Sequence, residues 1–419
     1  MGPAGANSPA PADAHAPREH VRHAPDTCED PLSHFAQYQD GVYADATEGR
    51  FPGLPYHHEQ LRELAAERME PGPFGYVEGS AGRERTADAN VDAFARYALR
   101  PRSLRPGAEH SGDLGVTLFG RRYPSPLLTA PIGVLEQVHE ESELAVARGA
   151  NLVGVPMVLS TASSTPIEKV AEAADEWWYQ LYWPSDDELA ESFVRRATAA
   201  GASAIVVTCD TKRLGWRPRD LALGHLPFLR SQGTANYFSD PEFRSRLKAD
   251  PEPGGVFTEA VFHFLGAFAS KALSTDNIAR IRQWTDLPVL VKGVVRGDEA
   301  ADLVDAGADG IVVSNHGGRQ IDNAVAALDA LPEVVEAVGG RAAVLFDSGV
   351  RSGSDVAVAM ALGAQAVLLG RPWVYGLAVE GSAGVEHVLR ATLAELQITA
   401  ELMGKDVVDL DASDVTRRP

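Results

Sequence analysis

The string SNHGGRQ at 314–320 contains the two residues best suited to do chemistry, His316 and Arg319. A histidine titrates near neutral pH, so it can take up and return a proton during a reaction. An arginine carries a permanent charge and a planar fork of donors that suits carboxylates and phosphates. The string directly follows GIVV at 310–313, an apolar run typical of a buried strand. These two residues are therefore candidates for proton transfer and anion binding at the end of a strand.

Polar side chains also follow seven other apolar runs. The runs are LLTA at 127, LVGV at 152, WWYQLYW at 177, AIVV at 204, PVLVKGV at 288, AAVLF at 342 and AVLL at 366. At or just after them stand Thr129, Ser160, Gln180, Tyr182, Thr208, Asp210, Lys292, Asp347, Arg351 and Arg371. One polar strand end would mean little, but so many at the ends of neighbouring strands predict a site.

Four of the runs follow a Gly-Ala pair, which begins at Gly149, Gly201, Gly307 or Gly363. Glycine suits the left-handed residue that closes a helix, and an apolar run suits a parallel strand covered on both faces. Eight such strands alternating with helical stretches predict an α/β fold, the (β/α)8 TIM barrel. An open doubly wound sheet is the alternative. The active site of a barrel lies at the carboxyl ends of its strands, where the polar residues stand.

The spacing of the Gly-Ala pairs indicates an insertion. The separations are 52, 106 and 56 residues, and the excess in the middle falls at 218–275, after the fourth strand. Long loops at this end of a barrel usually build or cover the active site, so we expect a mobile lid. The chain then divides into a disordered tail at 1–30, an N-terminal helical segment at 31–125 that packs on the barrel, the barrel with its lid at 126–403, and a C-terminal tail at 404–419.

The segment after the seventh strand is suited to a phosphate group. DSG at 347–349 leads into a helix whose start, at 352–355, fits a capping box. Free N–H groups and the positive end of the helix dipole attract an anion there, and Arg351 and Arg371 add charge. Many phosphate-binding barrels share this arrangement.

The composition of the chain argues against several classes of function. A net charge of −20 and a pI near 5.0 argue against a broad basic face for nucleic acid or for an anionic membrane. The longest apolar run, at 356–370, is too short to span a bilayer. Two distant cysteines, Cys28 and Cys209, predict neither a disulfide framework nor a metal cluster, and a reducing cytoplasm fits. The three histidines of the Ala- and Pro-rich N-terminus are irregularly spaced, which favours a solvated tail over a metal site.

Motifs throughout the chain match one enzyme family. SNHGGRQ, TAPIG at 129, QLYWP at 180, TCDTKRLGWRPRD at 208, LVKGV at 290, LFDSGVRSGSDV at 345 and LLGRPWVYGLA at 368 resemble, in order, the motifs of the FMN-dependent 2-hydroxy acid oxidases. From about Tyr43 to Gly404 the chain is similar to the lactate 2-monooxygenase branch. The resemblance implies an FMN-binding barrel that oxidises a small 2-hydroxy acid.

The resemblance also implies catalytic roles. His316 would be the base that takes the substrate hydroxyl proton while hydride passes to flavin N5. Asp210 would stabilise the resulting imidazolium, and Tyr182 would hydrogen-bond the substrate oxygen.

Four residues would bind the substrate. Arg319 would clamp its carboxylate through two hydrogen bonds, with Tyr76 as a hydroxyl donor to the same group. Arg217 matches a further arginine of lactate-specific members. Ala162 stands where glycolate oxidase has a bulky tryptophan, so the pocket has more space.

The resemblance assigns the remaining site residues to FMN. Lys292 would lie near flavin N1 and O2, where a positive charge stabilises the reduced, anionic ring. Contacts with the ring, the ribityl chain or the phosphate would come from Pro131, Ile132, Ser160, Gln180, Thr208, Ser314, Asp347, Gly349, Arg351, Gly370 and Arg371.

These residues lead to a first hypothesis, oxidation of L-lactate with O2 followed by decarboxylation of the bound keto acid. One alternative is a simple oxidase that releases keto acid and H2O2, and another is an enzyme for a larger 2-hydroxy acid in a biosynthetic pathway. A phosphate-binding barrel without turnover is a third alternative, against which the full set of reactive residues argues. The resemblance further implies a homotetramer or homo-octamer, and the N-terminus shows no haem-domain pattern.

Overall fold

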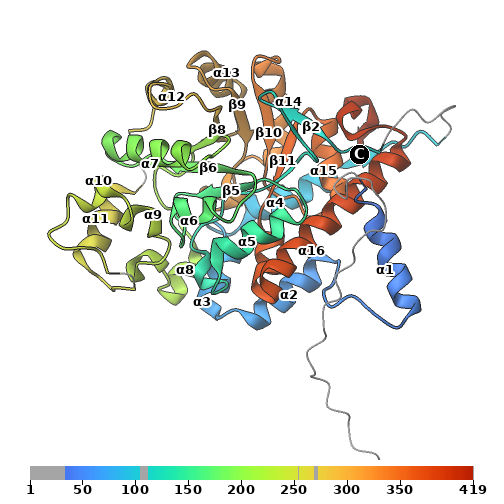
Figure 1. The fold of residues 1–419 in the computed structure, drawn as a ribbon. Helices are drawn as coiled ribbons and strands as arrows, with labels where there is room; N and C mark the ends of the chain where they lie inside the picture. The colour runs from blue at the N-terminus through green and yellow to red at the C-terminus, as the bar shows by residue number, and fades with distance from the viewer. Residues whose placement is uncertain (1–33, 104–111, 253, 269–271, 419) are drawn as a thin grey trace, which may run out of the picture.

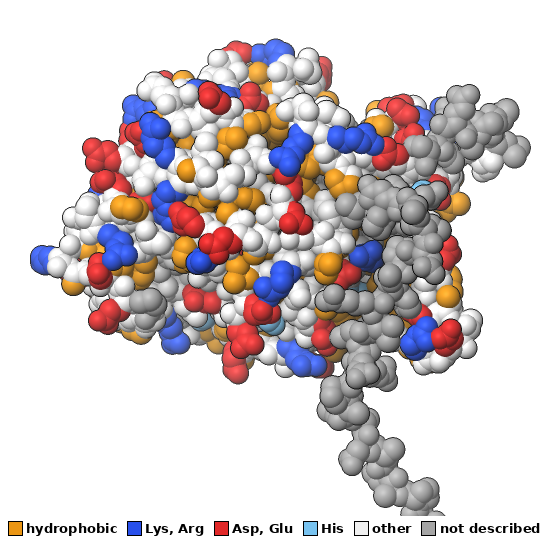
Figure 2. Space-filling model, in the orientation of Figure 1, with side chains coloured by type: hydrophobic (Ala, Val, Ile, Leu, Met, Phe, Trp, Pro, Cys, Tyr) orange, Lys and Arg blue, Asp and Glu red, His pale blue; other side chains and the backbone are white. Residues whose placement is uncertain are grey.

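A computed structural model describes residues 34–103, 112–252, 254–268 and 272–418. The predicted tail at 1–30, with its histidines and Cys28, lies outside these residues. Within them, no helix is both long and apolar enough to cross a bilayer. Acidic and basic side chains are interspersed over the face seen in Figure 2, without a broad basic area.

Eight parallel strands form one sheet that curls into a barrel (Figure 1). In sheet order they are β4 (Leu127–Thr129), β11 (Ala366–Leu369), β10 (Ala343–Phe346), β9 (Gly310–Val313), β8 (Val289–Val294), β7 (Ile205–Thr208), β6 (Trp177–Tyr182) and β5 (Met157–Ser160). The two end strands of this order meet where the Thr129 amide donates to the Pro156 carbonyl over 3.1 Å. The predicted (β/α)8 barrel is therefore confirmed, and the open sheet is wrong.

Helices between the strands surround the barrel, which explains why the strands are apolar on both faces. They are α5 (Ser142–Asn151), α6 (Ile167–Ala171), α7 (Asp187–Ala199), α12 (Thr275–Ile281), α13 (Gly297–Asp305), α14 (Ala327–Val338), α15 (Gly353–Ala361) and α16 (Arg371–Met403). The long α16 is kinked at Glu380 and Gly381, whose backbone angles are not helical.

The second strand lies later than the sequence pattern predicted. The run LVGV at 152–155 forms a turn, and β5 begins at Met157. Gly149 does not close a helix with a left-handed φ, as Gly201, Gly307 and Gly363 do. It lies inside α5, where a Cβ atom would come within 2.5 Å of the Ser382 carbonyl oxygen. This glycine lets α5 pack closely against α16. A residue without a side chain is needed at position 149 for helix packing, and not to end a helix.

The parallel register places predicted site residues next to one another. Ser160 lies opposite Gln180 across β5 and β6, and Thr208 lies between Tyr182 of β6 and Lys292 of β8. The carboxyl ends of these strands therefore form a continuous polar rim.

The N-terminal segment packs on the barrel through four helices: α1 (Gln37–Thr47), α2 (His58–Arg68), α3 (Pro71–Glu78) and α4 (Arg85–Ala95). Two short hairpin strands, β2 (Val116–Leu118) and β3 (Arg121–Tyr123), precede the barrel. The C-terminal residues return to this segment, because β12 (Val415–Arg417) pairs antiparallel with β1 (Tyr97–Leu99). The segment at 404–418 thus joins the C-terminal end of the described fold to the last part of the N-terminal segment.

The insertion at 218–275 has an aromatic core of its own. Its helices are α8 (Pro218–Leu223), α9 (Ala235–Phe238), α10 (Pro241–Arg244) and α11 (Glu259–Ala267). Tyr237, Phe243 and Phe264 are almost fully buried, and the Tyr237 ring lies 4.8 Å from both the Phe264 ring and the Phe193 ring of α7. The insertion is anchored to the barrel through this cluster, while its mobility stays a prediction.

Candidate active site

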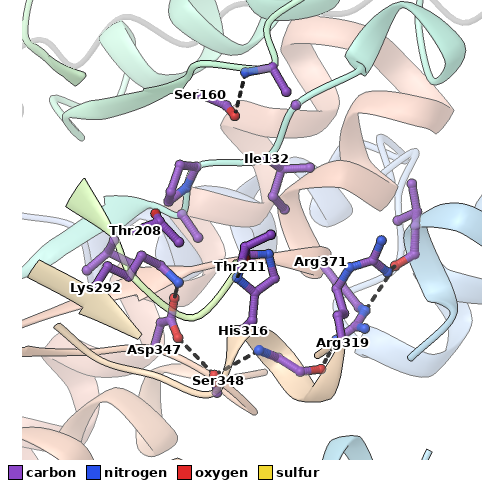
Figure 3. Close-up of a pocket in the computed structure, with 18 of the residues that line it drawn as sticks. Ile132, Ser160, Thr208, Thr211, Lys292, His316, Arg319, Asp347, Ser348 and Arg371 are labelled. Carbon is purple, nitrogen blue, oxygen red and sulfur yellow. Dashed lines mark hydrogen bonds and ion pairs between the residues drawn. The ribbon is translucent and has the colours of Figure 1, made fainter. Parts of the chain in front are cut away.

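A pocket opens at the carboxyl ends of the strands and collects most of the predicted site residues (Figure 3). Those that line it are Tyr76, Pro131, Ile132, Ser160, Ala162, Tyr182, Thr208, Arg217, Lys292, His316, Arg319, Asp347, Gly349, Arg351, Gly370 and Arg371. Asp210, Gln180 and Ser314 are not among the lining residues, but each hydrogen-bonds to one that is. The structure therefore brings all the residues implied by the family resemblance into one place. Thr129, a further strand-end residue, does not line the pocket, and its hydroxyl accepts from the Val158 amide over 3.1 Å.

His316 lines the pocket and forms a partly buried pair with Asp210, which lies behind it; the two side chains are 18% and 12% exposed. His316 Nδ1 lies 2.8 Å from Asp210 Oδ1, and Nε2 lies 3.4 Å from the Tyr182 hydroxyl. Burial lowers the pKa of His316 more than the attraction of Asp210 raises it. Burial alone would raise the pKa of Asp210, but the attraction and hydrogen bond of His316, the charge of Lys292 and the hydrogen bond from Thr211 together outweigh it, and the pKa is lowered. The pair at rest is thus a neutral imidazole held by a carboxylate, which suits a proton acceptor.

A turn after β9 presents His316 to the pocket. His316 has a left-handed φ of 60°, followed by left-handed Gly317 and Gly318. The side chain of Asn315 accepts a hydrogen bond from the Gly318 amide over 3.1 Å. It also exchanges two 2.7 Å hydrogen bonds with Asn90 of α4. The N-terminal segment therefore helps to shape the turn that carries the histidine.

Four arginines face the pocket, and none of them forms an ion pair with a carboxylate in the described residues. Burial, together with the nearby charges of Arg217 and Arg371, lowers the pKa of Arg319 to about 9. Burial and Arg371 likewise lower the pKa of Arg351. The Arg319 guanidinium lies 5.1 Å from the centre of the Tyr76 ring, and that of Arg217 lies 5.9 Å from it. Such a cluster is costly without anions, so this side of the pocket is built for bound carboxylate or phosphate.

Lys292 anchors the opposite side through two bonds. Its Nζ lies 2.7 Å from Asp347 Oδ2 and donates to Ser314 Oγ over 2.9 Å. Burial lowers the pKa of Lys292, but the attraction of Asp347 and Asp210 outweighs it and keeps the side chain charged. Figure 3 shows His316 between this pair and the arginines.

A second chain of polar groups extends from the ends of β5 to β7. Ser160 donates to Gln180 Oε1 over 3.1 Å, and the Gln180 amide donates to Thr208 Oγ1 over 2.9 Å. Gln180 Oε1 also accepts from the Thr161 amide over 3.3 Å. Gln180 is fully buried, so these three bonds hold its amide in one orientation beside the pocket wall.

Comparison with known proteins agrees with this geometry. Residues 65–417 match the model of the FMN-dependent dehydrogenases. An FMN-dependent alpha-hydroxy acid dehydrogenase of Schizosaccharomyces pombe is 41% identical, over 91% of this chain and 95% of its own. The chain belongs to the FMN-dependent dehydrogenase family.

Other members of the family are similar over most of their length. An L-lactate oxidase of Lysinibacillus sphaericus is 40% identical over 85% of this chain and 91% of its own. The crystal structure of mandelate oxidase with (S)-4-hydroxymandelic acid superposes with a TM-score of 0.76, at 37% identity, over 87% of this chain and 99% of that one. The protein is thus an FMN-dependent 2-hydroxy acid oxidoreductase, and its cofactor is FMN.

The residues present fit the phosphate end of FMN. The Ser352 hydroxyl caps α15 by accepting from the Asp355 amide over 3.2 Å. The second arm of the predicted capping box is absent, because Asp355 accepts from the Arg351 amide instead. Gly349 has a φ of 92°, and a Cβ there would clash with the Asn90 carbonyl oxygen, so only glycine fits. The N–H groups at the start of α15 are not free, contrary to the prediction, because the Gly353 and Ser354 amides donate to the Glu395 carboxylate over 2.8 Å and 3.3 Å. The anion site is instead lined by Gly349, Gly370 and the side chains of Arg351 and Arg371.

Several residues that line the pocket were not predicted from the sequence. Thr211 lines the pocket and donates to Asp210 Oδ1 over 2.9 Å. It follows Asp210 directly, so a search for polar residues one position further beyond the strand would have included it. Leu214, Phe228 and Phe268 add an apolar wall. Phe228 and Phe268 come from the insertion, and no local pattern separates them from the other aromatics of that segment. Ser348 also lines the pocket, although its neighbours Asp347 and Gly349 were the ones singled out.

Proposed function

We propose that this enzyme oxidises an L-2-hydroxy acid with O2, and that L-lactate is the first substrate to test. The observation that carries the proposal is the His316–Asp210 pair beside Tyr182, facing arginines that lack carboxylate partners. FMN, when bound, supplies the hydride acceptor. The remaining chemistry falls to side chains of this chain.

His316 Nε2 takes the proton of the substrate hydroxyl. Its lowered pKa keeps this nitrogen unprotonated at neutral pH, and Asp210, bound to Nδ1, stabilises the imidazolium that forms. Tyr182 keeps its hydroxyl proton because burial raises its pKa, so it donates to the substrate oxygen. Arg319, with Arg217 and Tyr76, binds the carboxylate and aims the Cα–H bond away from the imidazole.

The first candidate outcome is oxidative decarboxylation. The keto acid stays in the pocket, and H2O2 formed there oxidises it to a carboxylic acid one carbon shorter, CO2 and water. The anchored aromatic insertion supports this candidate, since Phe228 and Phe268 close one side of the pocket.

Product analysis after anaerobic loading with L-lactate and admission of O2 tests this candidate. Acetate and CO2 in equal amounts, with little free H2O2, are expected. Pyruvate and H2O2 in equal amounts would assign a simple oxidase.

A second candidate is oxidation of a larger 2-hydroxy acid with an apolar side chain. Ala162 lines the same pocket as Leu214, Phe228 and Phe268, so a bulky apolar group has both space and apolar side chains to contact. A 4-hydroxymandelate oxidase of Amycolatopsis orientalis is 39% identical over 83% of this chain. A panel of L-2-hydroxy acids of rising size tests the choice: an optimum at mandelate or a long aliphatic acid would replace lactate, and efficient turnover of lactate alone would retain it.

A further inference from the structure

Ser348 has a backbone conformation that serine rarely adopts. Its φ is 85°, in the left-handed region, and it stands between Asp347 and the left-handed Gly349. A glycine would take up this conformation without strain. The serine is 8% exposed and lines the active-site pocket. Strain of this kind persists only where the surroundings hold the residue in place. The contacts of the Ser348 hydroxyl are the ones that could do so.

The Ser348 hydroxyl uses its full hydrogen-bonding capacity. It donates to Asp347 Oδ1 over 2.8 Å and accepts from the amides of Gly317, over 3.1 Å, and Asn315, over 3.4 Å. One donor and two acceptor positions are all that a hydroxyl offers. The two amides flank His316 in the chain. The hydroxyl therefore binds the backbone of the turn on both sides of His316, the proton acceptor.

These contacts complete a ring of hydrogen bonds. Asp347 pairs with Lys292, and Lys292 donates to Ser314 Oγ. Ser314 Oγ in turn accepts from the amide of His316 over 3.0 Å. The backbone around His316 is thus held by two serine hydroxyls, each of which is tied to the Lys292–Asp347 pair. Figure 3 shows Ser348, Asp347 and Lys292 of this ring.

We propose that Ser348 is a positioning residue, which fixes the His316 turn relative to the charge of Lys292. His316 takes the substrate proton, and Lys292 would help to hold FMN, which would supply the hydride acceptor, so the two side chains must keep one spacing. Ser348 contributes the link that the left-handed backbone alone would not require. The inference rests on the proposed roles of His316 and Lys292.

The decisive variant is Ser348→Gly, which relieves the backbone strain and removes the hydroxyl. If the serine only formed a turn, this variant would be at least as active as the wild type. We expect instead that its anaerobic rate of flavin reduction at saturating substrate, per bound FMN, falls by about 10- to 100-fold, while the substrate Kd changes by less than about 3-fold. Ser348→Ala, which keeps the strain, should show the same loss of rate.

A second measurement does not depend on turnover. Hydrogen exchange of a peptide covering 314–320 should be faster in Ser348→Gly, because the Gly317 and Asn315 amides lose their acceptor. Asn323→Gly is the matched control, since Asn323 is also left-handed, with a φ of 62°, but is exposed and lies outside the ring. It should leave both readouts unchanged.

The outcomes separate the inference from the proposed function. A Ser348→Gly enzyme with the wild-type reduction rate and wild-type exchange would overturn the positioning role, and so would failure of both serine variants to bind FMN. A wild-type enzyme that no 2-hydroxy acid reduces would instead overturn the proposed function, whatever the exchange of the 314–320 peptide shows.

Discussion

At the scale of single residues, the site consists of charged and titratable side chains that are largely shielded from water. Lys292 is buried, and His316, Asp210 and Arg319 are partly buried. For each of them a neighbour or a bound anion compensates the loss of hydration. The direction of each pKa change follows from which of these two effects is larger. That balance makes single substitutions informative.

His316→Ala should keep FMN but lose about 10²–10⁴-fold in the rate of anaerobic flavin reduction, because a general base is removed. The flavin absorption spectrum reports the first part and stopped-flow bleaching the second. Reduction at the wild-type rate would contradict the assignment of the base.

Asp210→Asn tests the partner through pH. Asp210 raises the pKa of His316, so its removal should move the acid limb of kcat/KM to lower pH, while the maximal rate falls because the imidazolium loses its partner. In the wild type this limb should already lie below pH about 6.5, since burial lowers the pKa of His316. A limb that moved to higher pH in the variant would reverse the inferred coupling.

Arg319→Lys should raise KM by about 10-fold or more, because a point charge cannot reproduce two parallel hydrogen bonds to a carboxylate. Steady-state kinetics across the L-2-hydroxy acid panel measures the effect. Arg296→Lys, an exposed arginine paired with Asp298, is the matched control and should leave KM unchanged. Equal KM values for Arg319→Lys and the wild type would remove Arg319 from carboxylate binding.

At the scale of elements, segments outside the barrel complete the site. Helix α4 holds the His316 turn through the Asn90–Asn315 pair, and α3 supplies Tyr76. The insertion contributes Phe228 and Phe268, which pack on the buried ring of Phe264 at 5.3 Å and 5.1 Å. The barrel thus provides the charged groups, and the added segments decide which substrate and how much water the pocket admits.

Phe264→Ala should loosen the insertion without disrupting the barrel. Removing a buried aromatic ring costs about 3–5 kcal/mol, and the loss falls on the cluster around Tyr237. We expect faster limited proteolysis within 218–268 and, if the keto acid is normally retained, a larger share of free keto acid and H2O2 among the products.

Phe262→Ala on the same helix is the control, because Phe262 is 58% exposed. It should change neither the cleavage rate nor the product ratio. A Phe264→Ala enzyme with unchanged proteolysis would show that the insertion does not depend on its aromatic core.

At the scale of the whole molecule, FMN and the fold are coupled. The clustered arginines, most of which are partly buried, repel one another until an anion binds, so FMN should stabilise the folded chain by more than its contacts with the barrel rim alone. FMN removal should therefore lower the midpoint of thermal unfolding.

Arg351→Ala should reduce the rise in Tm that saturating FMN produces, while the FMN-free variant unfolds at or above the Tm of the FMN-free wild type, since one buried unpaired charge is gone. Differential scanning calorimetry with and without FMN measures both differences, and Arg296→Ala serves as the exposed control. An FMN-free variant that unfolds well below the FMN-free wild type would show that Arg351 stabilises the fold without its ligand.

Much of this protein could be predicted from the sequence because the information is local. Strand runs, the helix-closing glycines at 201, 307 and 363, and the polar strand ends depend on a few neighbouring residues and on the geometry of parallel strands. The motifs around His316 and Asp347 identified the family for the same reason. Only the tertiary structure decided the features that depend on distant partners. Gly149 serves packing against α16, and the prediction placed the second strand too early because it took this glycine for the end of a helix. Phe228 and Phe268 reach the pocket from the insertion, and the Ser348 hydroxyl bonds to the His316 turn. Such contacts join residues tens to hundreds of positions apart, and only the folded chain brings them within hydrogen-bonding or packing distance.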